Sequence, residues 1–242
     1  MTSSRPAFYA LEPGSWRDYV TLLHPPYTLW HLSYVVIGAA LAPELRAGRL
    51  CAALAAFLLA MGVGAHALDE LHGRPLRTRI GSGTLVGLAA ASIGAAIAIG
   101  VVAAILWNLW LLAFVAAGGF LVVAYNLELA GGLFHGDPWF SLGWGAFPVL
   151  TAYFLCAERI RLEAVAAAAS AGLLSHAQRV LSTPVRAARR RTASVEGRIV
   201  YVDGSEERID RLTLTRMPEA ALKTLAAASV TIGVALLLLH VR

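Results

Sequence analysis

The sequence predicts an all-α, polytopic membrane protein, and two observations carry this prediction. Of 242 residues, 58% are hydrophobic and 14% are charged, whereas about a quarter of the residues in an ordinary soluble domain are charged. Residues 80–127 contain no charged residue. As a helix this stretch would be about 72 Å long, enough to cross a hydrocarbon core of roughly 30 Å twice. We therefore expect one helical domain over residues 1–242 that is integral to the membrane.

About seven apolar segments are predicted to cross the membrane as helices. The long uncharged stretch is divided near residue 106, because Trp107, Asn108 and Trp110 are typical of an interfacial turn. The sixth segment is the weakest, since only residues 164–178 of it are uncharged. The predicted spans are residues 27–43, 50–69, 82–104, 106–126, 139–157, 162–180 and 220–240.

Positive charge is concentrated on one side of such a bundle. With seven spans, the N-terminus and the loops after the second, fourth and sixth spans share a side, and both arginine clusters lie there. Because arginine and lysine are enriched in cytoplasmic loops, we expect a cytoplasmic N-terminus and a location in the inner cell membrane. The same rule accounts for the net charge of +5 without a nucleic-acid partner. The clusters are Arg74, Arg77 and Arg79, and then Arg179, Arg186, Arg189, Arg190, Arg191 and Arg198.

The loop after the sixth span, residues 185–216, carries a strand pattern. Residues 197–209 alternate around a central Asp203-Gly204 pair. An Asp-Gly pair between two alternating runs is typical of the two-residue turn of a β-hairpin. We therefore expect a small hairpin in this loop, on the cytoplasmic side.

The end of the second span carries the densest group of ionisable side chains. If the helix continues through this group, His66, Asp69 and Glu70 lie on one of its faces. Ionisable residues at a membrane boundary are costly and mark candidate functional sites. Asp69 and Glu70 are suited to bind Mg²⁺, and Arg74 and Arg77 are suited to bind phosphate oxygens. The alternative is an interfacial salt-bridge cluster that anchors the helix end.

Two further polar patches fall at the ends of other spans on the same predicted side. One follows the fourth span and contains Tyr125, His135 and Asp137; the other ends the sixth span with His176 and Arg179. Each patch alone is also explained by a solvated turn or a polar helix end. Because all three patches fall on the same side, we expect them to surround a common cavity.

The histidines and carboxylates of these patches would also suit a transition metal such as iron or zinc. This alternative is a His/carboxylate membrane metalloenzyme. The sequence contains no paired-histidine spacing of the kind that places two ligands on one helical face. The candidate ligands are His66, Asp69, His72, Glu128, His135 and His176.

Four segments, taken in chain order, carry a family pattern. They are residues 24–42, which begin His-Pro-Pro-Tyr-Thr-Leu; residues 66–76, which begin His-Ala-Leu-Asp and end Arg-Pro-Leu; Tyr125; and residues 140–145. These segments resemble motifs of the UbiA superfamily of intramembrane prenyltransferases, nearest to its naphthoate prenyltransferase branch. The resemblance covers most of residues 20–240.

The resemblance implies a UbiA-like helical bundle that transfers an isoprenoid group from a diphosphate to an acceptor. In that family two Asp-rich motifs hold Mg²⁺ and the diphosphate, which then leaves an allylic cation to alkylate the acceptor. By this resemblance Asp69 is a metal ligand and Arg74 lies near the diphosphate. The second motif aligns with residues 175–180, which contain Arg179 and no carboxylate. The family usually has nine helices, against the seven predicted here.

We therefore predict a divergent prenyltransferase-like enzyme with Asp69 and Tyr125 as catalytic residues and Mg²⁺ held by Asp69 and Glu70. The alternative is a non-catalytic membrane protein that binds a lipid or a quinone in the same cavity. The sequence fixes neither the acceptor nor the oligomeric state. The predicted substrate-binding residues are His66, Arg74, Arg77, His176 and Arg179.

Overall fold

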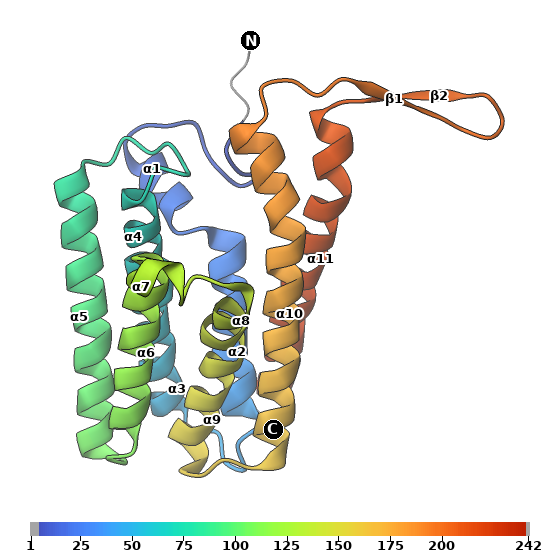
Figure 1. Ribbon diagram of the computed structural model, residues 1–242. Coiled ribbons are helices and arrows are strands. Elements are labelled where there is room, and N and C mark those ends of the chain that lie inside the picture. The colour runs from blue at the N-terminus through green and yellow to red at the C-terminus, as the bar shows by residue number, and fades with distance from the viewer. Residues whose placement is uncertain (1–4, 241–242) are drawn as a thin grey trace.

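Long helices that run along a common direction make up most of the computed structural model, which describes residues 5–240 (Figure 1). The structure is 73% helical, and each segment predicted to cross the membrane largely overlaps a helix. The prediction of a mostly helical fold is confirmed. The helices are α2 (Pro25–Ala40), the continuous α3–η1–α4 (Ala47–Phe57, Leu58–Ala65, His66–Leu71), α5 (Ser82–Leu106), α6 (Leu111–Asn126), the continuous α8–η2–α9 (Asp137–Phe140, Ser141–Ala146, Phe147–Ala157), α10 (Leu162–Arg186) and α11 (Arg211–Leu238).

Four helical segments of the described chain are long and apolar enough to cross a membrane. α2 and α6 have 16 residues each, which corresponds to about 24 Å against a core of roughly 30 Å. α10 has 25 residues, but its polar residues keep it out of this class. The number of seven spans therefore stays a prediction. The four segments are Ala47–Leu71, Ser82–Leu106, Asp137–Ala157 and Arg211–Leu238.

The connection between α6 and α8 lies well below the top of the bundle and is largely exposed on its side. Figure 1 shows that α7 (Leu129–Gly132) and the beginning of α8 lie well below the tops of α5 and α10. Residues 127–131 of this connection are exposed, so the segment lies on the outside of the bundle.

Three of the long helices contain a π-helical section among residues 5–240: η1 in α3–α4, η2 in α8–α9, and η3 (Ala187–Arg191) at the end of α10. η2 has glycine at positions 143 and 145. A Cβ at Gly145 would lie 2.5 Å from the carbonyl oxygen of Ala171 on α10, so glycine is what allows the η2 backbone to touch α10. π-helical turns are rare and occur frequently at functional sites.

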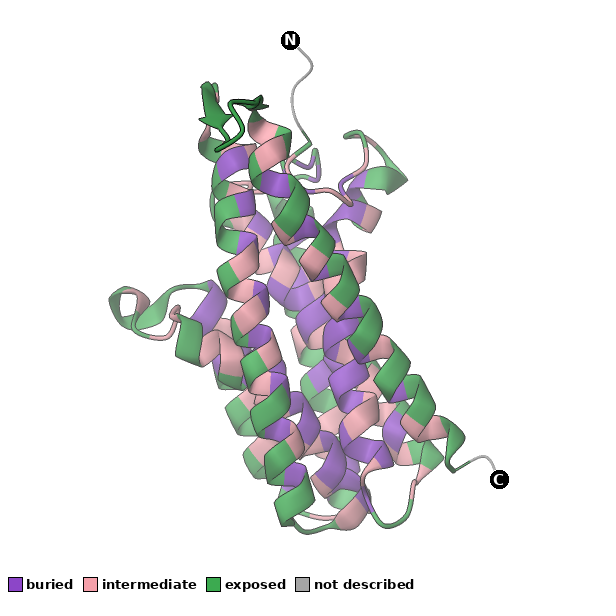
Figure 2. Ribbon diagram, turned by 90° about the vertical axis from the view of Figure 1, so that its right-hand side faces the viewer, coloured by how far each residue is buried: buried purple, intermediate pink, exposed green. Residues whose placement is uncertain are grey.

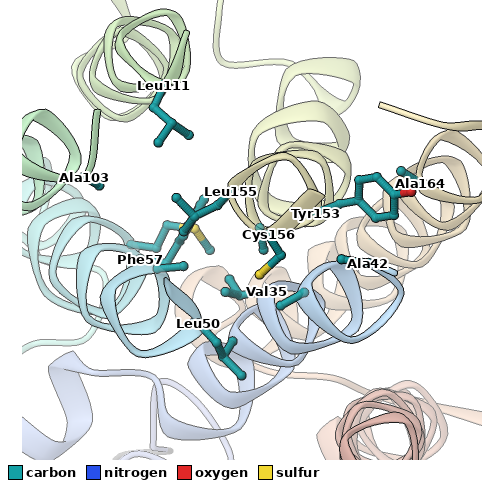
Figure 3. Close-up of a cluster of buried hydrophobic side chains, with 14 of the residues drawn as sticks. Val35, Ala42, Leu50, Phe57, Ala103, Leu111, Tyr153, Leu155, Cys156 and Ala164 are labelled. Atoms are coloured by element: carbon teal, nitrogen blue, oxygen red, sulfur yellow. The ribbon is translucent and has the colours of Figure 1, made fainter. Parts of the chain in front are cut away.

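A tightly packed apolar core lies between α2, α3 and α9 (Figure 3), where Val35, Phe57 and Leu155 point toward one another. A Cβ at Gly38 would lie 2.3 Å from the carbonyl oxygen of Val149, so this glycine brings α2 directly onto α9. Exposed residues lie mainly on the outer faces of the helices (Figure 2), and many of them are large and apolar. Helices that are apolar both on the face toward the core and on the outward face are typical of a membrane bundle.

The predicted hairpin is present and consists of β1 (Gly197–Val200) and β2 (Glu206–Ile209), which project away from the bundle beside α10 and α11 (Figure 1). Its turn differs from the predicted two-residue type. The Tyr201 N–H donates to the Ser205 carbonyl at 2.8 Å, and the Gly204 N–H donates to the Tyr201 carbonyl at 2.9 Å. The loop therefore has three residues, and of the Asp-Gly pair only Gly204 takes a positive φ, 82°.

α1 (Trp16–Leu22) and η3 (Ala187–Arg191) complete the helical elements of residues 5–240. α11 begins with a capping box, in which the Asp210 carboxylate accepts from the Thr213 N–H and the Thr213 hydroxyl accepts from the Asp210 N–H. This cap satisfies backbone donors that the first turn of a helix leaves without partners. It fixes where the chain turns from the hairpin into the last helix.

Candidate functional site

A polar cavity lies where α10 continues into η3, and side chains from all three predicted patches line it. The cavity has a volume of about 980 Å³, counting its opening to solvent. Asp69 and His66 reach it from α4, Tyr125 from α6 and Arg179 from α10. The structure thus brings four of the predicted site residues together, although they are as far as 113 positions apart in the chain.

Asp69 is the one predicted magnesium ligand that lines this cavity. No hydrogen bond or ion pair joins its carboxylate to another of the residues 5–240. The charged groups that act most strongly on it are the guanidiniums of Arg190 and Arg186, followed by Glu70. A carboxylate that is largely buried, has no direct partner and faces arginines is typical of a functional site rather than of a structural ion pair.

Arg179 joins α10 to the segment that follows α6. Its Nε donates to Asp137 Oδ1 at 2.6 Å, one Nη donates to the Tyr125 hydroxyl, and the other donates to the His135 carbonyl oxygen at 3.4 Å. Its guanidinium also lies over the rings of Tyr125 and Phe140, at 5.7 and 5.6 Å from their centroids. Because several of its donors are already engaged, Arg179 mainly fixes the wall of the cavity.

Two arginines that the sequence prediction did not assign to the site, Arg186 and Arg190, also line the polar cavity. Arg186 donates one hydrogen bond to the Thr183 hydroxyl at 3.2 Å, and Arg190 donates one to the Pro6 carbonyl at 3.2 Å. A guanidinium has five N–H donors, so both retain donors for an anion. A signal was present in the sequence: Arg186 and Arg190 follow Arg179 by seven and eleven positions, which places all three on one helical face.

The N-terminal segment covers one side of the polar cavity with residues 6–9. The Tyr9 hydroxyl is 2.7 Å from His24 Nδ1, and the His24 ring stacks on the His66 ring with centroids 4.1 Å apart. Burial, together with the nearby His66 and Arg190, lowers the pKa of His24 well below its usual value. His24 is therefore neutral at pH 7, and it adds no positive charge to the arginines of the cavity. No motif in the sequence pointed to Tyr9.

Glu70, the second predicted magnesium ligand, lies outside the polar cavity and is fully buried. Its carboxylate accepts hydrogen bonds from the Leu76 N–H at 2.9 Å and from the N–H and hydroxyl of Thr78, both at 2.8 Å. Both carboxylate oxygens are thus used to hold the loop between α4 and α5. The structure places Glu70 as an anchor of this loop.

Arg74, Arg77 and His176 are also not among the residues that line the cavity. The Arg74 guanidinium donates to the Ile80 carbonyl at 2.5 Å and to the Ser82 hydroxyl at 2.7 Å, which ties the loop to the start of α5. Arg77 donates to a backbone carbonyl of η3 at 3.5 Å. The His176 side chain is exposed on α10. The structure therefore does not bring these three residues to the polar cavity.

The carboxylates do not gather into a two-ligand magnesium site. Asp69 lines the cavity, whereas Glu70 holds the α4–α5 loop and Asp137 is paired with Arg179. Over residues 5–240, no group of three or more His, Cys, Asp or Glu side chains is placed to hold a metal ion. Mg²⁺ sites in proteins use carboxylates together with waters and substrate phosphates. The residues present fit an anion-binding cavity with a single carboxylate better than a site in which the protein alone holds a metal.

A second, apolar cavity of about 920 Å³, counting its opening, lies between α3, η1, α5, α6, η2 and α9. Only Trp144 and Thr151 among its lining residues have a nitrogen or oxygen in the side chain. Small residues such as Ala56, Gly100 and Gly119 leave the space open. A cavity lined in this way is suited to a hydrocarbon chain.

A small cavity of about 200 Å³ lies between the two large ones. Its lining includes His31 and His66, which also line the polar cavity, and Phe57 and Met61, which also line the apolar cavity. Trp144 lines all three. The polar and apolar cavities are therefore neighbours that share one aromatic side chain.

Comparisons of this chain with models of protein families, with curated proteins and with solved structures give no match. The resemblance to the UbiA superfamily therefore rests on the sequence motifs alone, and the two neighbouring cavities are the structural basis for a functional proposal.

Proposed function

We propose that this protein binds an isoprenoid diphosphate in the membrane and transfers its prenyl group to an acceptor, as a divergent UbiA-like prenyltransferase. The observation that carries the proposal is the adjacency of an arginine-lined polar cavity and an apolar cavity, with Trp144 at their border. A prenyl diphosphate has the same two parts, an anionic head and a hydrocarbon chain. In this proposal the head lies in the polar cavity and the chain extends toward the apolar one.

Arg186 and Arg190 bind the diphosphate. Guanidinium groups match the geometry of phosphate oxygens, and attraction between opposite charges is stronger in a partly buried site than in water. When the bond between the allylic carbon and the diphosphate oxygen breaks, negative charge grows on the leaving group. Arginines already held in position stabilise this charge without further reorganisation.

Asp69 and Tyr125 face the carbon that reacts. The Asp69 carboxylate stabilises the allylic cation and then takes the proton that the acceptor loses when its new bond to the prenyl carbon forms. Tyr125 lines the cavity beside Trp144, with ring centroids 4.5 Å apart, and its hydroxyl accepts a hydrogen bond from Arg179, which holds that guanidinium in place. A magnesium ion bound with the diphosphate would add charge neutralisation, and Asp69 is the residue of this cavity that would hold it.

The proposal includes the orientation of the protein. We place the polar cavity on the cytoplasmic side of the inner membrane. In this proposal seven helices cross the membrane. Supporting this, η3 carries three consecutive arginines and lies at the end of the bundle that holds the polar cavity. Excess arginine marks the cytoplasmic side of membrane proteins. The shortness of α2 and α6 is compatible with crossing because both are adjacent to cavities.

The Asp69→Asn variant tests the chemical step. We expect the purified protein in lipid nanodiscs to release diphosphate from a radiolabelled prenyl diphosphate, with membrane extract supplied as acceptor. Asp69→Asn should lower this release by about a hundredfold or more while the variant still binds the substrate. Asp203→Asn, in the exposed hairpin turn, is the matched control and should behave as the wild type. Unchanged release by Asp69→Asn would remove Asp69 from the mechanism.

A second candidate function is non-catalytic binding of an isoprenoid lipid or quinone. It is favoured by the single carboxylate of the polar cavity, since the family to which the motifs point uses several. In this case native mass spectrometry of the purified protein should show a co-purified lipid, and no prenyl diphosphate would be turned over. Binding without turnover by the wild type would select this function over transfer.

A further inference from the structure

Trp144 occupies a special position between the two large cavities. It is the one residue that lines the polar cavity, the apolar cavity and the small cavity between them, as far as residues 5–240 are concerned. Its side chain is buried, with 5% of its surface exposed. A hydrocarbon chain that reached from one large cavity into the other would have to pass this ring.

Two π-helical sections line this junction, together with residues of α2, α3 and α4. η2 contributes Trp144, and η1 contributes Met61 and Gly62 to the small cavity. A π-helical turn is wider than an α-helical one and shifts the side chains that follow it, which is one reason such turns are found at functional sites. Two of the three π-helical sections of residues 5–240, η1 and η2, therefore line the same small cavity.

Both the backbone and the ring of Trp144 have identified partners. The carbonyl oxygen of Trp144 is 2.8 Å from His31 Nδ1, which fixes η2 to α2. The ring stacks on Phe140, with centroids 5.4 Å apart and planes at 9°, and lies beside Tyr125. Ring contacts of this kind are worth roughly 0.5–1.5 kcal/mol each. They position the indole, and turning it aside would cost these contacts.

We infer that Trp144 is a specificity-determining residue that sets the length of hydrocarbon chain the protein accepts. A short chain lies on the polar side of the indole ring, whereas a long chain enters the apolar cavity only by displacing the ring from Phe140 and Tyr125. Because displacing the indole costs free energy, long chains bind more weakly than short ones. This inference rests on the proposed function, which identifies the ligand as a prenyl diphosphate. The position of Trp144 between the cavities does not depend on that identification.

The test compares ligands of two lengths in three variants. Binding of ten-carbon and twenty-carbon prenyl diphosphates, and of the two corresponding uncharged alcohols, is measured for wild type, Trp144→Ala, Trp144→Phe and Trp139→Ala in nanodiscs. Trp139 lines none of the three cavities and serves as the matched control. We expect Trp144→Ala to raise affinity for the twenty-carbon ligands about tenfold relative to the ten-carbon ligands, which corresponds to about 1.4 kcal/mol. For Trp144→Phe, the ratio of twenty-carbon to ten-carbon affinity should lie between those of the wild type and Trp144→Ala. Trp139→Ala should have the same ratio as the wild type.

The outcomes separate this inference from the proposed function. If the diphosphates bind but the ratio between lengths is the same in all variants, the inference is overturned and the anion site stands. If the diphosphates fail to bind while the alcohols show the dependence on Trp144, the inference stands and the proposed diphosphate site fails. If no ligand binds the folded wild type, both fail. Trp144→Phe keeps an aromatic ring at the position, so the test remains decisive if Trp144→Ala does not fold.

Discussion

The polar and apolar cavities have similar volumes and are built in opposite ways. The polar cavity is shaped by side chains that hydrogen bonds hold in place, such as Arg179 on Asp137 and Tyr9 on His24. The apolar cavity exists because alanine and glycine on its helices leave space that larger side chains would fill. Charged and hydrogen-bonded side chains define one cavity, and small apolar residues define the other. The two should therefore respond to different substitutions.

The largest expected effect is on the anionic head. Replacing both Arg186 and Arg190 by Gln removes at least two charge-assisted hydrogen bonds to the diphosphate, each worth about 1.5–3 kcal/mol. Affinity for a prenyl diphosphate should fall by about a hundredfold or more, measured by equilibrium binding of the radiolabelled ligand in nanodiscs. Affinity for the uncharged prenyl alcohol should stay the same.

Arg191→Gln is the control for this pair, since its side chain is exposed on η3 and does not line the cavity. An equal loss of affinity in the control would mean that general positive charge, rather than the polar cavity, attracts the ligand. That result would break the distinction between the two cavities.

A smaller and opposite effect is expected when the apolar cavity is filled. A Cβ at Gly119 would meet only the Ile97 side chain, at 3.7 Å, which is an ordinary contact, and Gly119 lines the cavity. We therefore expect the branches of Gly119→Leu to extend into the cavity. Displacing about two methylene groups of a long chain costs about 0.8 kcal/mol each, so affinity for a twenty-carbon prenyl diphosphate should fall about tenfold. Binding of inorganic diphosphate should not change.

Gly87→Leu on α5 is the matched control for this substitution, because a Cβ there meets no atom within 4 Å and the residue lies outside the cavity. If Gly119→Leu weakened inorganic diphosphate binding as strongly as long-chain binding, the two cavities would be one coupled site. The two cavities would then not bind the two parts of the ligand independently.

The smallest effect is expected from removal of magnesium. Arginines rather than paired carboxylates surround the polar cavity, so binding of prenyl diphosphate should weaken less than about threefold in EDTA. The measurement is the same radioligand assay with and without added Mg²⁺. Complete loss of binding in EDTA would show instead that a metal held by Asp69 is required, as the family resemblance implies.

Hydropathy predicted where the helices lie, and the predicted boundary near residue 106 is close to the observed turn between α5 and α6. There Asn108 Oδ1 accepts a hydrogen bond from the Trp110 N–H at 2.9 Å. The hairpin was also predicted, because alternation and an Asp-Gly pair are local signals. Its turn type was wrong, since the choice between a two-residue and a three-residue loop depends on strand register, which residues 197–209 alone do not fix.

The site was predicted in outline and not in detail. The concentration of ionisable groups around residue 69 correctly marked a region where polar side chains meet, but it did not separate cavity residues from loop anchors. Glu70 follows Asp69 directly in the sequence and yet points to Leu76 and Thr78. Neighbouring residues on a helix are about 100° apart around its axis, so the rotation of α4 alone decides which of the two carboxylates faces the cavity.

The sequence by itself determined that this chain forms apolar helices with arginine-rich ends, because hydropathy and charge are properties of segments. Tertiary structure alone decided that Arg186, Arg190 and Tyr9 join Asp69, and that Trp144 stands between a polar and an apolar cavity. The physical reason is that a cavity is a property of how helices pack. Its lining depends on helix rotation, on π-helical turns and on close glycine contacts, none of which a single segment encodes.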